Sequence, residues 1–356
     1  MARALGMGHR GWGVELARLA SCALLLAGLT APPAWAAADA PDPAKLAALF
    51  ESLRADPHPD LKGIVILQHG RRVAEAYFNG DDADSLHDIR SATKSITSLL
   101  MGIAIDRHLV GGVDDPIARY LPGLPPDKAT ITIRDLLTMR SGLAADDDDP
   151  TSPGNEDKLD QAPDWTAAAY AVPPAHPPGD HYLYCSLNAF LVGAVVEGAT
   201  RQPLDQFADA VLFGPLGIHR HPWRHVAPGH ATGQGNLQLT ARDVAVLGQL
   251  VLAEGRFRGR QLVSAPWVEA SLSDLVDISA TDPYADHYGY MWYARALPIP
   301  GGATLPVHFA SGNGGNKIYL IPAADMVVAI TSSAYGHGYG QKRSQEILLG
   351  VLGALR

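Results

Sequence analysis

Residues 90–106 of the chain read RSATKSITSLLMGIAID, and this stretch decides the fold. Its apolar side chains recur with the i, i+3, i+4, i+7 spacing of an α-helix, at Ile96, Leu99, Leu100 and Ile103. Further apolar residues fall on the other side, and a helix that is apolar nearly all round is a buried one. The stretch therefore predicts a buried helix at the centre of the protein.

The first turn of this helix carries two polar residues, Ser91 and Lys94. Residues three apart share one face of a helix, and a lysine at a helix N-terminus meets the positive end of the helix dipole, which disfavours its ammonium form. A hydroxyl beside such an amine can act as an activated nucleophile. The alternative is a chance Ser-x-x-Lys with the lysine extended to solvent. We expect the catalytic arrangement, because folding alone gives no reason for this placement.

The N-terminus has the composition of a cleavable leader. Three arginines precede an apolar run over residues 19–29, and the small-residue sequence Ala34-Trp35-Ala36 follows. This pattern predicts a secretory signal peptide over residues 1–36, and hence a secreted or periplasmic protein. The apolar run is too short for a permanent transmembrane helix, so no stable membrane anchor is expected.

Charge and cysteine content exclude some classes of protein. The 356-residue chain has a formal net charge of −9, and removal of the leader, with three arginines and one glutamate, takes the charge to −11. An acidic protein is a poor candidate for binding nucleic acid. Cys185 is the one cysteine left, so no internal disulfide is expected. The acidic run 146–149 and the histidines within 219–230 fit no metal-ligand template, so neither a metal nor another cofactor is predicted.

Strand patterns lie toward both ends of the chain, and helical patterns fill the middle. The economical architecture is α/β (α+β), with one antiparallel sheet built from both ends, flanked by helices, and a helical lobe inserted between them. Residues 37–60 are expected to form a linker and an N-terminal helix. Residues 61–356 are expected to form one domain, with a sheet lobe at 61–90 and 288–356 and a mostly helical lobe at 91–287. Besides the central helix, strands are predicted over 63–68, 73–78, 288–294, 307–310, 317–321 and 326–330, and helices over 44–55, 133–139, 184–197, 204–212, 241–251 and 341–354.

Two further segments combine residues that can carry chemistry. Tyr184 opens an apolar helical segment, and near a lysine ammonium a tyrosine has a lowered pKa and can take a proton from a serine. Residues 310–316, ASGNGGN, open a strand whose glycines let a ligand approach the backbone closely. There Ser311 can donate to a substrate, and the Asn313 N–H can complete an oxyanion hole with the Ser91 N–H. The structural alternatives are a core tyrosine and a simple glycine turn.

The order of these three motifs resembles the serine β-lactamase and penicillin-binding-protein superfamily. Within it, the chain looks most like the class C β-lactamase-related hydrolases: family VIII-type esterases, D-aminopeptidases and 6-aminohexanoate-dimer-hydrolase-like enzymes. The phrases LLTMRSGL at 136–143, FGPLGI at 213–218, LTARD at 239–243 and GNGGN at 312–316 match landmarks of that group. The resemblance runs from about residue 60 to the C-terminus and implies the β-lactamase/transpeptidase-like fold.

The resemblance also implies roles for individual residues. Ser91 matches the acylated nucleophile, Lys94 its helper and Tyr184 the general base. Ala310 stands where the family's strand triad begins with lysine or histidine, and Ser186 stands where many members have asparagine. The residues carried over as candidates for substrate contact are Ser186, Asn188, His308, Ser311 and Gly312.

The resemblance implies an exported serine hydrolase that acts through an acyl-enzyme on a small ester, amide or β-lactam-like substrate. Because Ala310 offers neither charge nor donor for a substrate carboxylate, we expect esters or small amides to be preferred to β-lactams. His308 would share the face of Ala310 and could partly substitute, whereas Lys317 falls on the opposite face of a regular strand. A class C-like β-lactamase, a D,D-peptidase and a non-catalytic penicillin-binding-like module stay open as alternatives, and the sequence predicts no oligomeric state.

Overall fold

The computed structural model of the chain describes residues 40–226, 229–298 and 304–355. Contacts divide the chain into residues 1–33 and residues 34–356, and all that follows concerns the second unit. The predicted signal peptide lies outside the described residues. In the part of the chain that is described, no helix combines the length and the apolar character needed to cross a bilayer.

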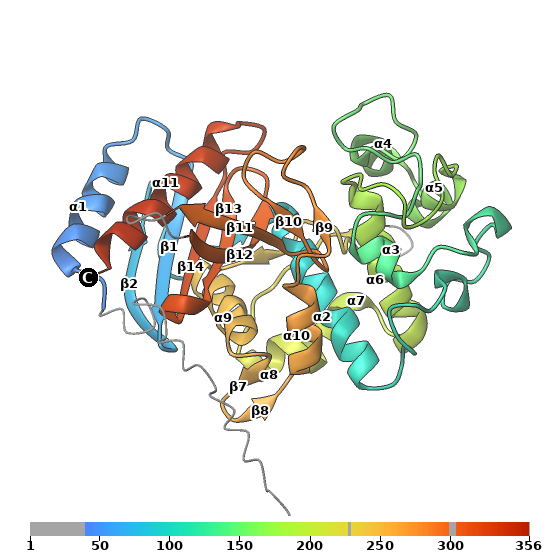
Figure 1. Cartoon of the computed structure of the whole chain (residues 1–356), viewed down its shortest axis with the longest axis horizontal. Coiled ribbons are helices and arrows are strands. Elements are labelled where there is room, and N and C mark those ends of the chain that lie inside the picture. Colours follow the sequence, from blue (N-terminus) through green and yellow to red (C-terminus); the bar gives the residue numbers. More distant parts are fainter. Residues whose placement is uncertain (1–39, 227–228, 299–303, 356) are drawn as a thin grey trace, which may run out of the picture. The chain divides into compact units, whose positions relative to one another are not determined.

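An antiparallel sheet of eight strands forms the framework, in the order β2-β1-β14-β13-β12-β11-β10-β9. The first strand in the chain, β1, lies between β2 and the last strand, β14, so the two ends of the described chain meet inside one sheet (Figure 1). This confirms the predicted fold class. The strands of the sheet are β1 (Leu61–Gln68), β2 (Arg71–Tyr77), β9 (Val276–Asp277), β10 (His287–Tyr288), β11 (Tyr293–Pro298), β12 (Thr304–Gly312), β13 (Asn316–Ile321) and β14 (Met326–Ser332).

Helices and short ribbons account for the rest of the regular structure, and most of them lie between β2 and β9 in the sequence. Three two-stranded ribbons pair β3 (His87–Asp88) with β6 (Gln238–Leu239), β4 (His225–Val226) with β5 (His230–Ala231), and β7 (Arg256–Phe257) with β8 (Arg260–Gln261). The α-helices are α1 (Pro43–Arg54), α2 (Thr93–Asp106), α3 (Ile133–Leu137), α4 (Glu156–Gln161), α5 (Trp165–Ala171), α6 (Ser186–Thr200), α7 (Leu204–Ala208), α8 (Gly214–Leu216), α9 (Ala241–Leu252), α10 (Ala265–Ser271) and α11 (Tyr339–Ala354). Single 3-10 or π turns are η2 (Arg90–Ala92), η3 (Ile117–Arg119), η4 (Pro126–Lys128), η5 (Asp209–Phe213) and η6 (Pro322–Ala324).

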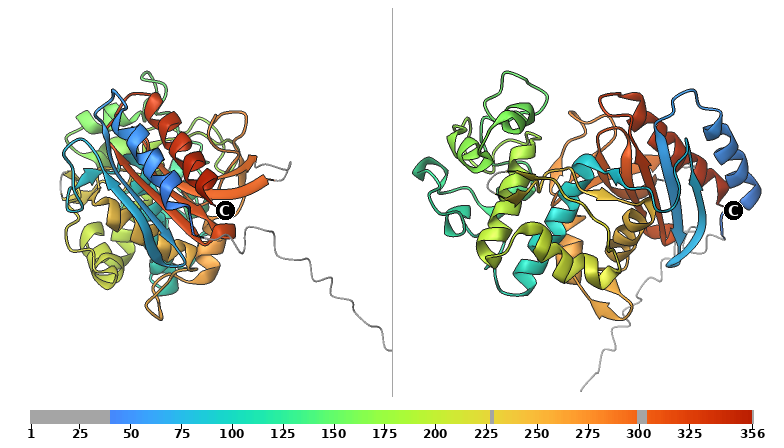
Figure 2. Two further views of the ribbon diagram at one scale, coloured as in Figure 1. Left: turned by 90° about the vertical axis from the view of Figure 1, so that its left-hand side faces the viewer. Right: turned by 180° about the vertical axis from the view of Figure 1, so that it is seen from behind.

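Helices cover both faces of the sheet. The first and last helices, α1 and α11, lie side by side on one face (Figure 2). On the other face α9 packs against β1, β13 and β14, and α2 packs near β12 (Figure 1). The start of α9 is fixed by a capping box, in which Thr240 and Asp243 each bond the other's backbone N–H. The apolar face predicted for this helix is the face that meets the sheet.

The central helix α2 is buried along nearly its whole length, from Thr93 to Ala104, as its apolar pattern predicts. Two of its polar side chains find backbone partners: the Ser95 hydroxyl donates to the Met291 carbonyl over 2.5 Å, and the Thr97 hydroxyl donates to the Gly233 carbonyl over 2.6 Å. Hydrogen-bonded hydroxyls can be buried without a large cost. The helix therefore ties the last strands to the middle of the chain.

One predicted element is wrong. The apolar run 288–294 is predicted to be a single strand, but residues 289–292 form a tight turn, and the residues on either side of it belong to two paired strands, β10 and β11. Met291 has a positive φ of 61°, and the Gly289 N–H donates to the Trp292 carbonyl over 2.8 Å. The aromatic residues on both sides of the turn are buried, which is why the run reads as one continuous strand.

Candidate active site

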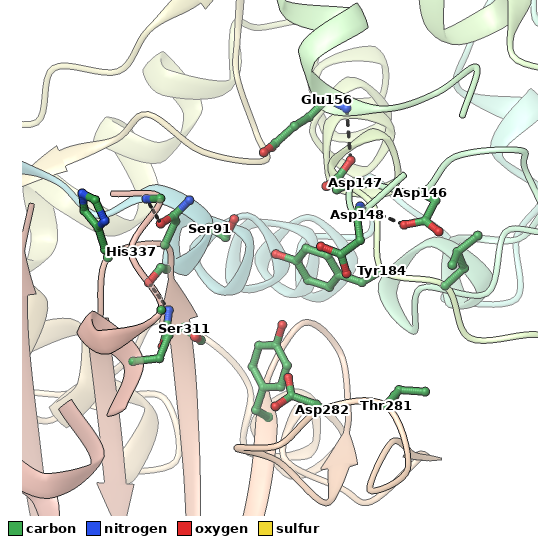
Figure 3. Close-up of a pocket in the computed structure, with 18 of the residues that line it drawn as sticks. Ser91, Asp146, Asp147, Asp148, Glu156, Tyr184, Thr281, Asp282, Ser311 and His337 are labelled. Carbon is green, nitrogen blue, oxygen red and sulfur yellow. Dashed lines mark hydrogen bonds between the residues drawn. The ribbon is translucent and has the colours of Figure 1, made fainter. Parts of the chain in front are cut away.

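A cleft of about 670 Å³ opens at the N-terminal end of α2, between the sheet and the helical part of the chain. Figure 3 shows Ser91 in this cleft, with Ser311 on one side and Tyr184 on the other. The chain reaches the cleft with η2, the end of β12, the segment before α6, and three loops. Those loops contribute residues 146–148, 281–282 and 336–338.

Ser91 lies in η2, one turn before α2, and its hydroxyl is paired with Lys94. The Lys94 Nζ donates to the Ser91 Oγ over 3.0 Å, to the Ser186 Oγ over 3.1 Å and to the Gln234 carbonyl over 3.0 Å. An ammonium has three N–H groups, so these three acceptors satisfy it fully. The side chain of Lys94 is buried, with 2% of its surface exposed.

The charge state of Lys94 differs from the expectation. We expected a destabilised ammonium, but the pKa of Lys94 lies above its usual value. Burial alone would lower this pKa, yet the negative charges of Tyr184 and of two nearby carboxylates outweigh burial and raise it. The raised pKa and the three acceptors around Nζ both favour an ammonium that donates to Ser91 over a free amine that accepts its proton.

Tyr184 faces Ser91 across the cleft. Its hydroxyl points toward Ser91 (Figure 3), and its ring centroid lies 5.0 Å from the Lys94 Nζ. The side chain is half-buried and lines the cleft. A phenolate in this place can take a proton from Ser91 and become a phenol, and the neighbouring ammonium stabilises the phenolate beforehand.

The end of β12 forms the opposite wall, where Ser311, Gly312 and Asn313 all line the cleft. At Gly312 the strand passes so close to η2 that a Cβ atom would lie 2.1 Å from the Ile89 carbonyl oxygen. The Asn313 carbonyl accepts from the Asn316 amide over 2.9 Å, which fixes the peptide beside the cleft. Only glycine lets the two backbone segments meet here, and Ser91 and Asn313, the residues of the predicted oxyanion hole, both line the cleft.

Lys317 brings a titratable amine to the Ser311 side of the sheet, on the face opposite Ala310 as the sequence predicts. Lys317 on β13 is paired directly with Ser311 on β12, so both side chains lie on one face of the sheet. The Lys317 Nζ donates to the Ser311 Oγ over 2.7 Å and lies 4.6 Å from the centroid of the Phe309 ring. Burial lowers the pKa of Lys317 to about 7. Lys317 lies on the face of the sheet opposite Ala310, as the strand alternation predicts. Ser311 lies on that same face, so the amine of Lys317 lies beside the cleft residue Ser311.

Three of the candidates for substrate contact do not line the cleft. Ser186 is fully buried behind Lys94, and its hydroxyl bonds that lysine and Glu156. Asn188 is buried in α6, with its amide 3.7 Å from the Met139 sulfur. His308 lies on the face of β12 opposite Ser311, because strand side chains alternate, and burial lowers its pKa. Ser311 and Gly312 are the two candidates that reach the cleft.

Carboxylates dominate the remaining wall of the cleft. Asp146, Asp147, Asp148, Glu156 and Asp282 line it (Figure 3). No lysine or arginine lines it within the described ranges. Burial raises the pKa of Asp147 to about 6. The acidic run is visible in the sequence, but nothing in its local pattern shows that the loop folds back over the Ser91 cleft.

The acidic loop is held in part by the side-chain amide of Asn155. The Asn155 side chain donates to the carbonyl oxygens of residues 146, 147 and 149, over 3.0 to 3.2 Å. The histidines near residue 225 pair with single carboxylates, as His225 does with Asp205 over 3.0 Å. Within the described ranges no group of three or more potential ligands could hold a metal ion.

The chain is similar to known hydrolases in sequence and structure. A family model described as beta-lactamase matches residues 46–352. A 6-aminohexanoate-dimer hydrolase from Paenarthrobacter ureafaciens is 24% identical over 289 residues, which cover 76% of this chain and 71% of the relative. Among solved structures, a penicillin-binding protein homolog from Caulobacter crescentus has a TM-score of 0.69 at 18% identity, covering 88% of this chain and 97% of that one. A class C beta lactamase from Rhodobacter sphaeroides has a TM-score of 0.64 at 18% identity, covering 86% of this chain and 99% of that one.

Proposed function

Since the chain belongs to the beta-lactamase family and is a serine hydrolase of that family, we propose that it cleaves carboxylic esters or small amides through an acyl-enzyme on Ser91. The observation that carries this proposal is the contact of the Ser91 hydroxyl with a buried ammonium, Lys94, over 3.0 Å. Tyr184 faces the same hydroxyl. This is the arrangement of a nucleophile whose proton can be removed and whose oxyanion can be stabilised.

The proposed reaction begins with attack by the Ser91 oxygen on the substrate carbonyl carbon. The proton of Ser91 passes to the Tyr184 phenolate oxygen, which becomes a neutral phenol, and the negative charge moves to the carbonyl oxygen between the N–H groups of Ser91 and Asn313. When the tetrahedral intermediate collapses, the bond to the leaving group breaks and Tyr184 returns the proton to that group. Water then repeats the sequence on the acyl-enzyme, with Tyr184 again as base and acid.

The preference for esters or small amides rests on the charge of the cleft. Its carboxylates repel a second carboxylate, and juxtaposed like charges cost several kcal/mol in a shielded site. The β-lactams and D-alanyl peptides carry such a carboxylate, whereas a simple ester or amide carries none. A protonated amine on the substrate would be attracted by the same wall.

A class C-like β-lactamase or D,D-peptidase is the second candidate, and one observation favours it. Lys317 stands 2.7 Å behind the Ser311 hydroxyl, so a substrate carboxylate at Ser311 would meet a nearby positive charge. A non-catalytic module is disfavoured, because a binding site has no need of Ser91, Lys94 and Tyr184 together.

Export of the protein is a further part of the proposal and rests on the leader pattern of residues 1–36 alone. Expression of the full chain in a bacterial host would test it. We expect a periplasmic product whose N-terminus lies just after Ala36. A cytoplasmic product that keeps Met1 would contradict export without affecting the hydrolase proposal.

The substrate class is tested with three probes on the purified protein. Short p-nitrophenyl esters report esterase activity, nitrocefin reports β-lactamase activity, and D-alanyl dipeptides report peptidase activity. We expect measurable ester turnover, with slow or absent turnover of nitrocefin. Efficient cleavage of nitrocefin without ester turnover would reverse this order and support the second candidate. Failure of a fluorophosphonate probe to label the protein would support the non-catalytic module.

A further inference from the structure

A continuous chain of hydrogen bonds leads from Ser91 to an acidic residue on α4. The Lys94 Nζ contacts the Ser91 Oγ at 3.0 Å and the Ser186 Oγ at 3.1 Å, and the Ser186 Oγ lies 2.8 Å from the Glu156 Oε2. A carboxylate only accepts hydrogen bonds, and a hydroxyl has one proton to give. The Ser186 proton therefore points to Glu156, and the Ser186 oxygen accepts from Lys94.

The position of Glu156 is itself fixed by the backbone. One Asp147 oxygen accepts from the Ser186 N–H over 2.6 Å, and the other accepts from the Glu156 N–H over 3.2 Å. Ser186 and Glu156 are the first residues of α6 and α4, so a single carboxylate joins the starts of two helices. Glu156 is thus held against Ser186, while its side chain also lines the cleft.

We propose that Glu156 is a positioning residue of this site, which acts through the Ser186 hydroxyl to hold Lys94 as an ammonium that donates to Ser91. The inference rests on the proposed acyl-enzyme function and goes beyond it, because it assigns a role to a residue outside the three carried-over motifs. With the three N–H groups of Lys94 directed at acceptors, the Ser91 proton cannot point at Lys94. It is left to point at Tyr184, the proposed base.

The charge of Glu156 supports the same role. Lys94 is buried, and a buried ammonium needs nearby negative charge to stay ionised. The carboxylates of Glu156 and Asp147 both raise the pKa of Lys94. Loss of the Glu156 charge would let Lys94 lose its proton at a lower pH. A neutral Lys94 would accept the proton of Ser91, and the direction of the hydrogen-bond chain would reverse.

Two substitutions test the link between Glu156 and Lys94 on a neutral p-nitrophenyl ester. Glu156→Gln removes the charge at constant size, and Ser186→Ala removes the hydroxyl that transmits it. We expect each to lower kcat roughly 10- to 100-fold with KM changed less than about threefold, and the double variant to be no slower than the slower single one. In Glu156→Gln the alkaline limb of the kcat–pH profile should move to lower pH by about one unit.

Asp157→Asn is the matched control, since it removes the same charge from the adjacent exposed position of α4. This variant should keep the wild-type kcat and pH profile. Multiplicative losses in the double variant, an unmoved alkaline limb, or an effect of Glu156→Gln on KM alone would overturn the inference. Thermal melting of each variant shows whether it folds. If Glu156→Gln does not fold, the kcat and pH profile of Ser186→Ala test the same link.

Failure of this inference is distinguishable from failure of the proposed function. If Ser91→Ala keeps its activity, the acyl-enzyme proposal fails. If activity depends on Ser91 but Glu156→Gln has the wild-type kcat and pH profile, the acyl-enzyme stands and the role of Glu156 is wrong.

Discussion

The ammonium nitrogen of Lys317 lies 2.7 Å from the hydroxyl oxygen of Ser311, although the two residues stand on neighbouring strands. This contact places the amine of Lys317 behind the cleft wall formed by Ser311, whereas Ala310 contributes no charged group. Lys317 is 2% exposed and lies over the Phe309 ring, so the charge reaches the cleft through Ser311. When Lys317 is protonated it donates to Ser311, and the Ser311 proton is free to bond a substrate.

The burial of Lys317 makes stability depend on pH in a defined direction. Burial lowers its pKa in the folded state to about 7, from an ordinary value of 10.5. Between these values the unfolded state binds more protons, so the free energy of unfolding rises as the pH rises through this window. Lys317→Met removes this rise. In urea denaturation, the free energy of unfolding of the variant should therefore exceed that of wild type most near pH 6. This difference should shrink toward pH 10.

Lys342→Met is the control for this experiment, since Lys342 is exposed on α11 and has an ordinary lysine environment. Its effect on stability should be small and nearly independent of pH. A Lys317→Met variant whose stability difference from wild type stays constant from about pH 6 to pH 10 would show that Lys317 keeps its charge throughout.

Ala310→Lys is not expected to rebuild a carboxylate site. The Ala310 side chain is fully buried and points away from the face that carries Ser311 and the cleft. A lysine there would bury an unpaired charge, which costs several kcal/mol. We expect a lower melting temperature and no gain in nitrocefin turnover. Gain of nitrocefin turnover in a fully folded variant would show that residue 310 reaches the cleft.

Gly312→Ala should be among the most damaging single-methyl additions in the protein. The new Cβ would lie 2.1 Å from the Ile89 carbonyl oxygen, so β12 would have to move away from η2. Overpacking of this kind costs about 1–3 kcal/mol or more, and it would also separate Ser91 from Asn313, whose N–H groups form the proposed oxyanion hole. The melting temperature and kcat should both fall. Gly353→Ala, where nothing lies within 4 Å, is the control and should leave both unchanged.

Lys94 and Tyr184 are expected to act as one unit on Ser91. The ammonium stabilises the phenolate that takes the proton, so loss of either side chain removes the same step. Lys94→Met and Tyr184→Phe should each lower kcat by about 10³-fold, and the double variant should lose little more. Losses that multiply in the double variant would show that the two side chains contribute to separate steps. Melting temperatures of the three proteins serve as the control for folding.

The parts of the fold that could be predicted are those that local patterns determine. The apolar period of residues 96–103 gives a buried helix, and the capping pair at Thr240 and Asp243 gives the start of α9. The prediction of one strand over residues 288–294 is wrong because the residues on both sides of the turn are buried and apolar. Their burial, and not a strand's alternation, accounts for the apolar run. A run of apolar residues indicates which residues are buried, but it does not distinguish one strand from two strands joined by a turn.

The parts of the site that could not be predicted depend on which distant segments come together. Ser91 and Lys94 are three residues apart, so their contact follows from a single helical turn. Lys317 meets Ser311 through a strand register, and Glu156 meets Ser186 through the fold of a loop. Neither pairing has a local sequence signal.

Acylation of Ser91 is the most direct test of the central claim. The wild type and Ser91→Ala are mixed with a short p-nitrophenyl ester, quenched in acid during turnover and analysed by intact mass and peptide mapping. We predict one acyl group on the peptide that contains Ser91, no adduct in the variant, and a loss of turnover of at least about 10³-fold in a variant that melts like wild type. Comparable turnover by Ser91→Ala, or an adduct on another serine, would contradict this claim.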